Sequence, residues 1–318
     1  MTPLLPTQPL LFEPIFQERV WGGRRLESMF RKKLPPGKQI GESWEIVDRP
    51  EAQSVVREGP WRGRTLHDLW LENREELFGE IADSARFPLL IKLLDAEETL
   101  SLQVHPPAAR AEELGGEAKT EFWYIVQAAS DAKLYVGLQR HSSRAKIEQA
   151  LRDDSVAEHL HAVAVREGDA MFLPSGRMHA IGAGNVIIEI QQNSDTTYRV
   201  FDWNRVDASG VPRALHLEES LRSINFDDYE PALVSPVGES LVRDASFEVE
   251  KWELHSPRAA ADSGTFAIVG CVSGAVGCGE ITIKPGEFLL VPATLKNRML
   301  EPRRDGSSLL RVTIPLQK

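Results

Sequence analysis

The chain has 318 residues, of which 42% are hydrophobic and 26% charged, and its formal net charge is −10. This length allows a full hydrophobic core and suggests two domains, while the negative charge argues against nonspecific binding to nucleic acid or an anionic membrane. We therefore expect neither as a partner, although a few cations in one pocket suffice to bind a small anionic molecule.

Short apolar runs separated by prolines and glycines predict a mainly β protein. In chain order the candidate strands are Ser43–Val47, Leu89–Leu94, Leu100–Val104, Phe122–Val126, Lys133–Val136, Ala170–Leu173, Val186–Gln191, Tyr198–Phe201, Phe247–Glu253, Phe266–Val269, Glu280–Ile283, Phe288–Val291 and Leu309–Val312. Two helical patches interrupt these strands. The stretch from Thr65 to Leu77 has apolar residues at helical spacing, and Ser143–Leu151 begins with a helix-capping serine and precedes a second short helix near Val156–Leu160.

A faint internal repeat suggests how the chain is divided. The segment Gly168–Pro174 matches Gly286–Pro292 in character at each position, and Glu121–Val126 resembles Thr265–Gly270. We predict an N-terminal domain over residues 1–235, which carries the helical insertions, and a smaller C-terminal domain over residues 236–318.

The two copies of the repeat differ at the positions where a metal site would lie. His179 stands 11 residues after Gly168 in the first copy, and Asn297 stands 11 residues after Gly286 in the second. In the same alignment Glu121 is matched by Thr265. The second copy lacks both candidate ligands, so we expect any metal ion to belong to the first domain.

The two cysteines, Cys271 and Cys278, are fewer than a small secreted scaffold would carry, so we interpret them as reduced thiols of a cytoplasmic protein. A disulfide between them is the alternative. The N-terminal segment lacks the basic start and long apolar run of a signal peptide, and no stretch reaches the length of a transmembrane helix. Both observations favour the cytoplasm.

The segment from Thr99 to Pro106 contains the densest group of candidate functional residues. Side chains alternate along a strand, so Ser101, Gln103 and His105 share one face. Inside a barrel such a polar face needs a partner, because unpaired buried polar groups are costly, and that partner is either water or a bound ion. The alternative is the solvated outer face of an antiparallel strand.

Glu121 and His179 extend this group to two imidazoles, one carboxylate and one amide. Imidazole nitrogen and carboxylate oxygen suit zinc and similar divalent ions, with one position left open for water or substrate. Gln103 would be a rare zinc ligand. Because it is neutral, Glu121 alone would offset the dication, and the remaining positive charge would stabilise an anionic intermediate.

Three further residues suggest a binding site for an anion. Glu189 lies in the strand Val186–Gln191 with its side chain on the same face as Gln191, and the chain returns through Arg199. An arginine binds phosphate through two parallel hydrogen bonds, although a surface salt bridge is the alternative for Arg199. Lys92, in the middle of an apolar strand, either extends its ammonium group to solvent or meets a negative ligand.

Several of these motifs are long enough to identify a family, namely Gly41–Glu45, Phe87–Lys92, Leu100–Pro106, Lys119–Glu121 and Glu189–Arg199. They resemble the type I mannose-6-phosphate isomerases in their short bacterial form, over about residues 10 to 210. The resemblance implies a mainly β fold of two cupin-type jelly-roll barrels, with a few short helices inserted in the first and a degenerate second barrel without metal. It also implies one zinc ion per chain and interconversion of mannose 6-phosphate and fructose 6-phosphate.

The resemblance also assigns roles to residues. The implied metal ligands are Gln103, His105, Glu121 and His179. The implied catalytic residues are Lys119, Glu189 and Arg199, and the implied substrate-binding residues are Lys92 and Ser101. The segment from Gly168 to His179 resembles the second cupin motif, whereas the first is broken because Gln103 replaces a histidine and Glu121 lies further along the chain.

The implied reaction moves a proton between neighbouring carbons through a cis-enediol(ate), which requires a base. Glu189, Lys119 and a hydroxide on the metal remain open as candidates for that base. The rival hypotheses are a cupin oxygenase, an isomerase of glucose 6-phosphate, and a non-catalytic sugar-binding cupin. The sequence leaves open whether the protein is a monomer or a homodimer.

Overall fold

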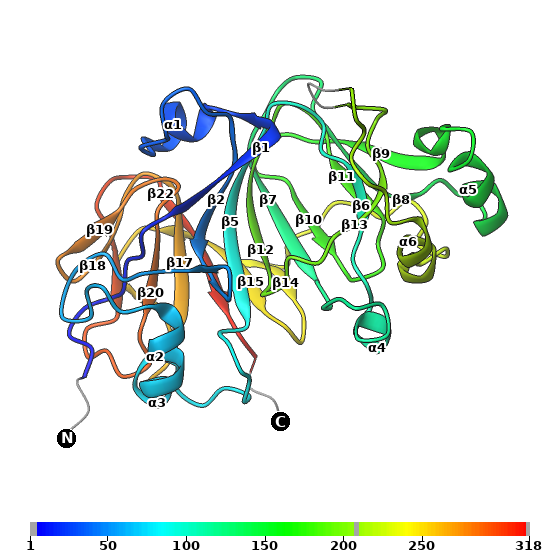
Figure 1. Cartoon of the computed structure of the whole chain (residues 1–318). Coiled ribbons are helices and arrows are strands. Elements are labelled where there is room, and N and C mark those ends of the chain that lie inside the picture. The colour runs from blue at the N-terminus through cyan, green and yellow to red at the C-terminus, as the bar shows by residue number, and fades with distance from the viewer. Residues whose placement is uncertain (1–4, 207–209, 316–318) are drawn as a thin grey trace.

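The structure is a computed structural model that describes residues 5–206 and 210–315, and its strands form two barrels (Figure 1). The strands of the first barrel are β1 (Ile15–Gly23), β2 (Ile40–Ile46), β5 (Leu89–Ala96), β6 (Leu102–Val104), β7 (Glu121–Ala128), β8 (Lys133–Leu138), β9 (Leu160–Ala164), β10 (Ala170–Leu173), β11 (His179–Ile181), β12 (Asn185–Gln192) and β13 (Tyr198–Phe201), with the short pair β3 (Asp48–Arg49) and β4 (Ala52–Gln53) beside them. Those of the second barrel are β14 (Ser240–Arg243), β15 (Glu248–Leu254), β16 (Arg258–Ala259), β17 (Ala267–Ser273), β18 (Val276–Cys278), β19 (Ile281–Ile283), β20 (Phe288–Val291), β21 (Met299–Pro302) and β22 (Ser307–Thr313). The prediction of a mainly β protein is therefore confirmed.

Each barrel consists of two antiparallel sheets with matching strand orders. The first barrel pairs the order β1-β2-β5-β12-β7-β10 with β13-β6-β11-β8-β9, and the second pairs β14-β15-β22-β17-β20 with β16-β21-β18-β19. In the larger sheets, β2-β5-β12-β7-β10 of the first barrel correspond strand by strand to β14-β15-β22-β17-β20 of the second. This shared order confirms the internal repeat.

Strand register corrects the predicted alignment of the repeat at one position. Leu173 pairs with Glu121 in the first barrel, whereas its counterpart Val291 pairs with Ala267 in the second. The counterpart of Glu121 is therefore Ala267, and the match with Thr265 was wrong by two residues. A shift of two keeps the alternation of side chains intact, which is why the sequence pattern alone did not expose the error.

The largest apolar core lies between the two barrels. It joins one face of the six-stranded sheet to the facing side of the sheet that contains β17 and β22, and it includes Phe87 and Phe266 with ring centroids 5.9 Å apart. Separate apolar clusters fill the interior of each barrel. The N-terminal segment also crosses to the second barrel, because Leu10 and Leu290 exchange two backbone hydrogen bonds.

The division of the chain into two domains at residue 235 stays a prediction. Residues 224–239, around this position, contain neither helix nor strand.

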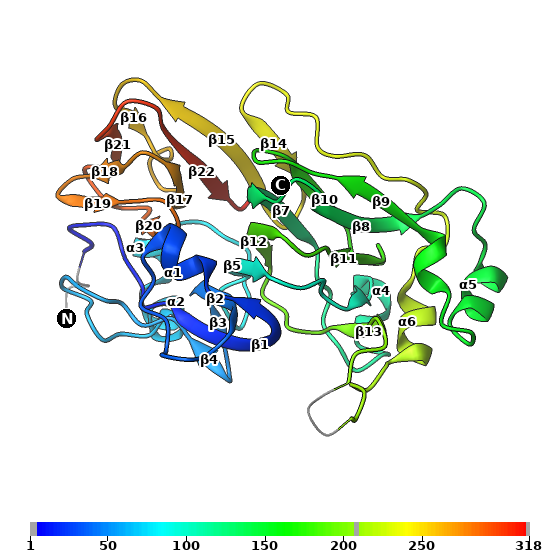
Figure 2. The same cartoon turned by 90° about the horizontal axis from the view of Figure 1, so that it is seen from above.

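The helices are short and lie on the outside of the barrels, as the two views show (Figures 1 and 2). They are α1 (Arg25–Phe30), α2 (Leu66–Glu72), α3 (Arg74–Phe78), α4 (Ala108–Ala111), α5 (Arg144–Ala150) and α6 (Leu217–Ser223). The predicted helix from Thr65 to Leu77 is two helices that meet at Asn73, and the predicted helix after α5 is a single 3-10 turn. The Thr65 and Ser143 side chains accept backbone N–H groups and so cap α2 and α5.

No helix within the described ranges is long and apolar enough to cross a membrane. Cys271 and Cys278 are both buried free thiols, so the alternative of a disulfide between them is not realised.

Candidate metal centre and substrate pocket

Three buried side chains meet at one end of the first barrel. Glu121 opens β7 in one sheet, His179 opens β11 in the other, and His105 follows directly after β6. Their candidate ligand atoms all lie within 4.8 Å of one another. The antiparallel pairing of β6 with β11 and of β7 with β10 therefore brings together residues that are far apart in the sequence.

Backbone carbonyl groups orient both imidazoles. The Nδ1 atom of His105 lies 2.7 Å from the carbonyl oxygen of Thr196, and that of His179 lies 2.9 Å from the carbonyl oxygen of Arg177. Because a carbonyl oxygen can only accept, each Nδ1 carries the proton and each Nε2 keeps its lone pair. These Nε2 atoms face the Glu121 carboxylate at 3.3 and 3.5 Å. The contacts of the two Nδ1 atoms with carbonyl oxygens are of the kind that orients histidine ligands in metal sites.

The protonation states also suit metal binding. Burial lowers the pKa of His105 to about 4 and lowers that of His179, so both rings are neutral near pH 7. Burial raises the pKa of Glu121, but the Lys119 ammonium group and the two imidazoles outweigh burial. The pKa of Glu121 therefore lies well below its usual value. The cluster therefore presents two neutral nitrogens and one carboxylate, a donor set typical of zinc.

The buried polar atoms of this cluster suit a bound cation. Among the described residues, Glu121 Oε2 and the Nε2 atom of His179 are buried without a hydrogen-bond partner, while Glu121 Oε1 faces Lys119. Such atoms are costly unless a ligand satisfies them. Gln103 lies directly opposite His179 in the β6–β11 pairing, so its side chain shares the face of the imidazole. The Lys119 ammonium group contacts Glu121, where it partly offsets the negative charge.

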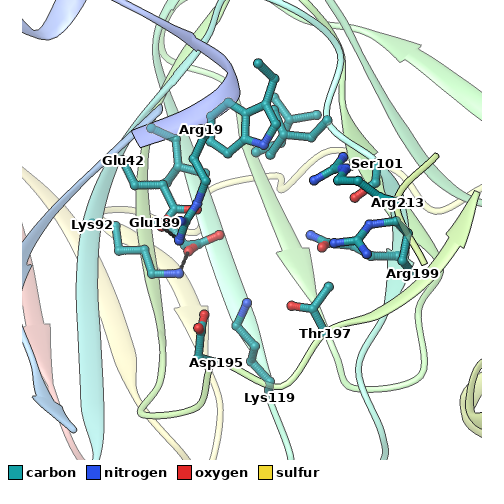
Figure 3. A pocket seen from close by; sticks show the side chains of 15 residues that line it. Arg19, Glu42, Lys92, Ser101, Lys119, Glu189, Asp195, Thr197, Arg199 and Arg213 are labelled. Atoms are coloured by element: carbon teal, nitrogen blue, oxygen red, sulfur yellow. Dashed lines mark hydrogen bonds and ion pairs between the residues drawn. The ribbon is translucent and has the colours of Figure 1, made fainter. Parts of the chain in front are cut away.

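A cavity of about 370 Å³ opens beside the cluster. Figure 3 shows the side chains around it. Its lining residues are Arg19, Trp21, Glu42, Lys92, Leu94, Leu100, Ser101, Gln103, Lys119, Ile181, Glu189, Asp195, Thr197, Arg199 and Arg213. Gln103 and Lys119 thus link the cavity to the cluster of His105, Glu121 and His179. A molecule bound in the cavity would lie next to this cluster.

One wall of the cavity contains Lys92 and Glu189, which belong to a row of paired residues on the six-stranded sheet. Trp44, Lys92, Glu189 and Trp123 are successive cross-strand partners on β2, β5, β12 and β7. Lys92 Nζ lies 2.9 Å from Glu189 Oε2, and the Trp123 indole N–H donates to Glu189 Oε1 at 2.9 Å. Burial lowers the pKa of Lys92, but the carboxylates of Glu189 and Glu42 outweigh it and raise the pKa. Lys92 is therefore protonated, and its negative partner within the chain is Glu189.

The opposite wall carries two guanidinium groups, those of Arg199 and Arg213 (Figure 3). Asp202 holds Arg213 through two hydrogen bonds of 2.5 and 2.7 Å. Arg199 donates to the carbonyl oxygen of Ala214 at 2.8 Å, while its Nε is buried without a partner among the described residues. Burial, together with the nearby Arg213, lowers the pKa of Arg199.

All nine residues singled out from the sequence lie in the metal cluster or on the cavity lining. Five polar lining residues were not assigned from the sequence: Arg19, Glu42, Asp195, Thr197 and Arg213. Glu42 and Asp195 lie inside motifs that support the family resemblance, so a signal for them existed. No pattern in the sequence marks Arg213.

Comparisons with known proteins agree with this site. A family model described as the catalytic domain of phosphomannose isomerase type I matches residues 10–138. Mannose-6-phosphate isomerase ManA of Bacillus subtilis is 36% identical over 314 residues, which cover 93% of this chain and 97% of that protein.

Solved structures give the same result. The crystal structure of the mannose 6-phosphate isomerase from Bacillus subtilis superposes with a TM-score of 0.84 at 31% identity, and the match covers 96% of this chain and 100% of that one. A zinc-bound mannose 6-phosphate isomerase shares the fold with a TM-score of 0.76 at 18% identity, over 97% of this chain and 100% of that one. These matches confirm the cupin-type fold, and the alternatives of an oxygenase and a non-catalytic cupin are wrong. The chain belongs to the type I phosphomannose isomerases.

Proposed function

We propose that this isomerase interconverts mannose 6-phosphate and fructose 6-phosphate with one zinc ion per chain, held by Gln103, His105, Glu121 and His179. The observation that carries the proposal is the buried cluster of two oriented imidazoles and one carboxylate beside a cationic cavity. The zinc-bound structure with the same fold supports the choice of metal. When bound, the ion supplies Lewis-acid polarisation of a substrate oxygen and stabilises negative charge that develops there.

The proposed proton transfer passes through a cis-enediol(ate). Glu189 is the group we assign to it, because its carboxylate lines the cavity and is positioned by Lys92 and Trp123. Lys119 is less suited to accept a proton, since its ammonium group is engaged with Glu121. In this proposal Lys119 instead donates a hydrogen bond to the oxygen whose charge changes.

The phosphate group of the substrate would bind at the wall formed by Arg199 and Arg213. The Nε atom of Arg199 is buried and has no hydrogen-bond partner in the part of the chain that the structure describes, and a guanidinium fork binds phosphate oxygens in pairs. Ser101 lies on the same side of the cavity in Figure 3 and offers a hydroxyl group to the sugar. Anchoring at this wall would hold the sugar carbons between the metal cluster and Glu189.

A chelation experiment tests this function. Turnover of mannose 6-phosphate, measured through a coupled assay of fructose 6-phosphate, is expected to fall to background after treatment with a chelator and to return when zinc is restored. Glucose 6-phosphate in the same assay measures sugar preference. Turnover that survives complete removal of metal, checked by elemental analysis of the same sample, contradicts the proposed role of the ion.

A further inference from the structure

We infer that Trp123 is a positioning residue of the reaction, which fixes the Glu189 carboxylate against the metal cluster. Its side chain is fully buried and contacts two functional groups at once. The indole N–H donates to Glu189 Oε1 at 2.9 Å, and the ring packs edge to face against His179 with centroids 5.3 Å apart. The inference rests on the proposed function through the role of Glu189.

The two oxygens of Glu189 have different partners, and this determines the orientation of the carboxylate. Oε1 accepts the indole hydrogen of Trp123 from one neighbouring strand, and Oε2 lies 2.9 Å from Lys92 Nζ on the other. Because the partners lie on the two strands that flank β12, rotation of the carboxylate would break its hydrogen bond with Trp123. A hydrogen bond to an ionised group is short and strong, and burial strengthens it further.

The surrounding charges explain why a rigid partner is needed. Glu42, Glu121 and Asp195 all act electrostatically on Lys92, so the ammonium group has several competing carboxylates nearby. An indole N–H, in contrast, is a neutral donor on a side chain that is locked by packing. Trp123 therefore keeps Glu189 in one orientation even where the lysine is shared among several anions.

The second barrel contains a matched control for this arrangement. By register, Glu250 and Arg311 occupy the positions that Lys92 and Glu189 occupy in the first barrel. They form an ion pair at 2.9 Å, and the buried Trp252 donates its indole N–H to Glu250 at 3.0 Å. Trp252→Phe thus removes the same kind of hydrogen bond from the corresponding ion pair, but far in sequence from the proposed metal ligands. Trp252 lies on β15 two residues from Glu250, whereas the position of Trp123 itself is taken by Val269.

The first measurement is kinetic. Trp123→Phe keeps an aromatic ring beside His179 and removes only the donor, so we expect kcat to fall roughly 10-fold while KM changes less than about 2-fold. Trp252→Phe is expected to leave both constants within about 2-fold. In the Glu189→Gln background, the additional loss from Trp123→Phe is expected to be less than about 2-fold, since the two residues act through one contact.

The second measurement does not depend on activity. In protein labelled with 15N-tryptophan, Trp123→Phe identifies the indole resonance of Trp123, and Glu189→Gln is expected to shift that resonance upfield. An unshifted resonance overturns the contact. A shifted resonance together with additive kinetic losses overturns the positioning role.

Metal content separates this inference from the proposed function. Trp123→Phe is expected to keep the zinc content of the wild type, and loss of zinc in this variant would overturn the inference by assigning the effect to His179. If Glu189→Gln retains full turnover, the proposed role of Glu189 fails, and the resonance experiment still decides whether the Trp123 contact exists.

Discussion

Both barrels have an ion pair at the same two strand positions, but the surroundings of that pair differ. In the first barrel the ion pair of Lys92 and Glu189 borders a cavity whose lining contains six further charged groups, whereas in the second the pair of Glu250 and Arg311 lies next to an apolar cluster. At the position of Glu121 the second barrel has Ala267, which is fully buried in that cluster. The fold is thus repeated, whereas the cluster of His105, Glu121 and His179 lies in the first copy.

This difference has a physical basis in the cost of burying polar groups. Two imidazoles, a carboxylate and a lysine in the interior of the first barrel lose their contacts with water, and this loss opposes folding unless partners compensate. The apolar interior of the second barrel and the large core between the barrels contribute burial without such a cost. We therefore expect substitutions in the two barrels to separate activity from stability.

The largest effect is expected at the metal cluster. His179→Ala removes one imidazole and leaves Glu121 without its neighbour, so zinc content is expected to fall to near zero and turnover to fall by about 10³-fold or more. The matched control is Asn297→Ala, an exposed residue of the second barrel that stands 11 residues after Gly286 as His179 stands 11 residues after Gly168. Elemental analysis and the coupled assay check both variants. Normal zinc content in His179→Ala, or a zinc loss in Asn297→Ala, contradicts the assignment.

A smaller effect is expected at the cationic wall of the first barrel. Arg199→Ala removes the guanidinium group proposed to bind phosphate, so kcat/KM is expected to fall by about 10²-fold while zinc content is unchanged. Arg258→Ala serves as the control, because this arginine pairs with Glu239 on the surface of the second barrel. Unchanged kinetics in Arg199→Ala would remove this residue from the site. Inorganic phosphate should also inhibit the wild type more strongly than the variant.

Alternation along single strands was enough to predict much of this comparison. It places Ser101, Gln103 and His105 on one face, and the repeat identifies the copy that lacks His179. Several predicted strands agree with the structure within two residues, because the apolar runs are bounded by glycine or proline. The ligand set itself required the family resemblance, since nothing in the spacing brings Glu121 to His179.

The partner of Lys92 could not be predicted, because register between strands is set by contacts that are distant in sequence. Lys92 and Glu189 are neighbours only once β5 pairs with β12. The same limit explains the wrong match of Glu121 with Thr265. A pattern that alternates every two residues is unchanged by a shift of two, and the pairing of β17 with β20 is needed to correct it.

The last prediction tests this corrected alignment through stability. Ala267 is fully buried in the apolar interior, so Ala267→Glu places a carboxylate among apolar side chains, and we expect the free energy of unfolding to fall by about 3–5 kcal/mol. Thr265 is only half-buried and donates its hydroxyl to the carbonyl oxygen of Asp262, so Thr265→Glu is expected to cost about 1 kcal/mol. Urea unfolding followed by tryptophan fluorescence measures both values. Equal costs would contradict the assignment of Ala267 to the interior position. A large difference supports Ala267 as the counterpart of Glu121, at a position where the second barrel has apolar packing.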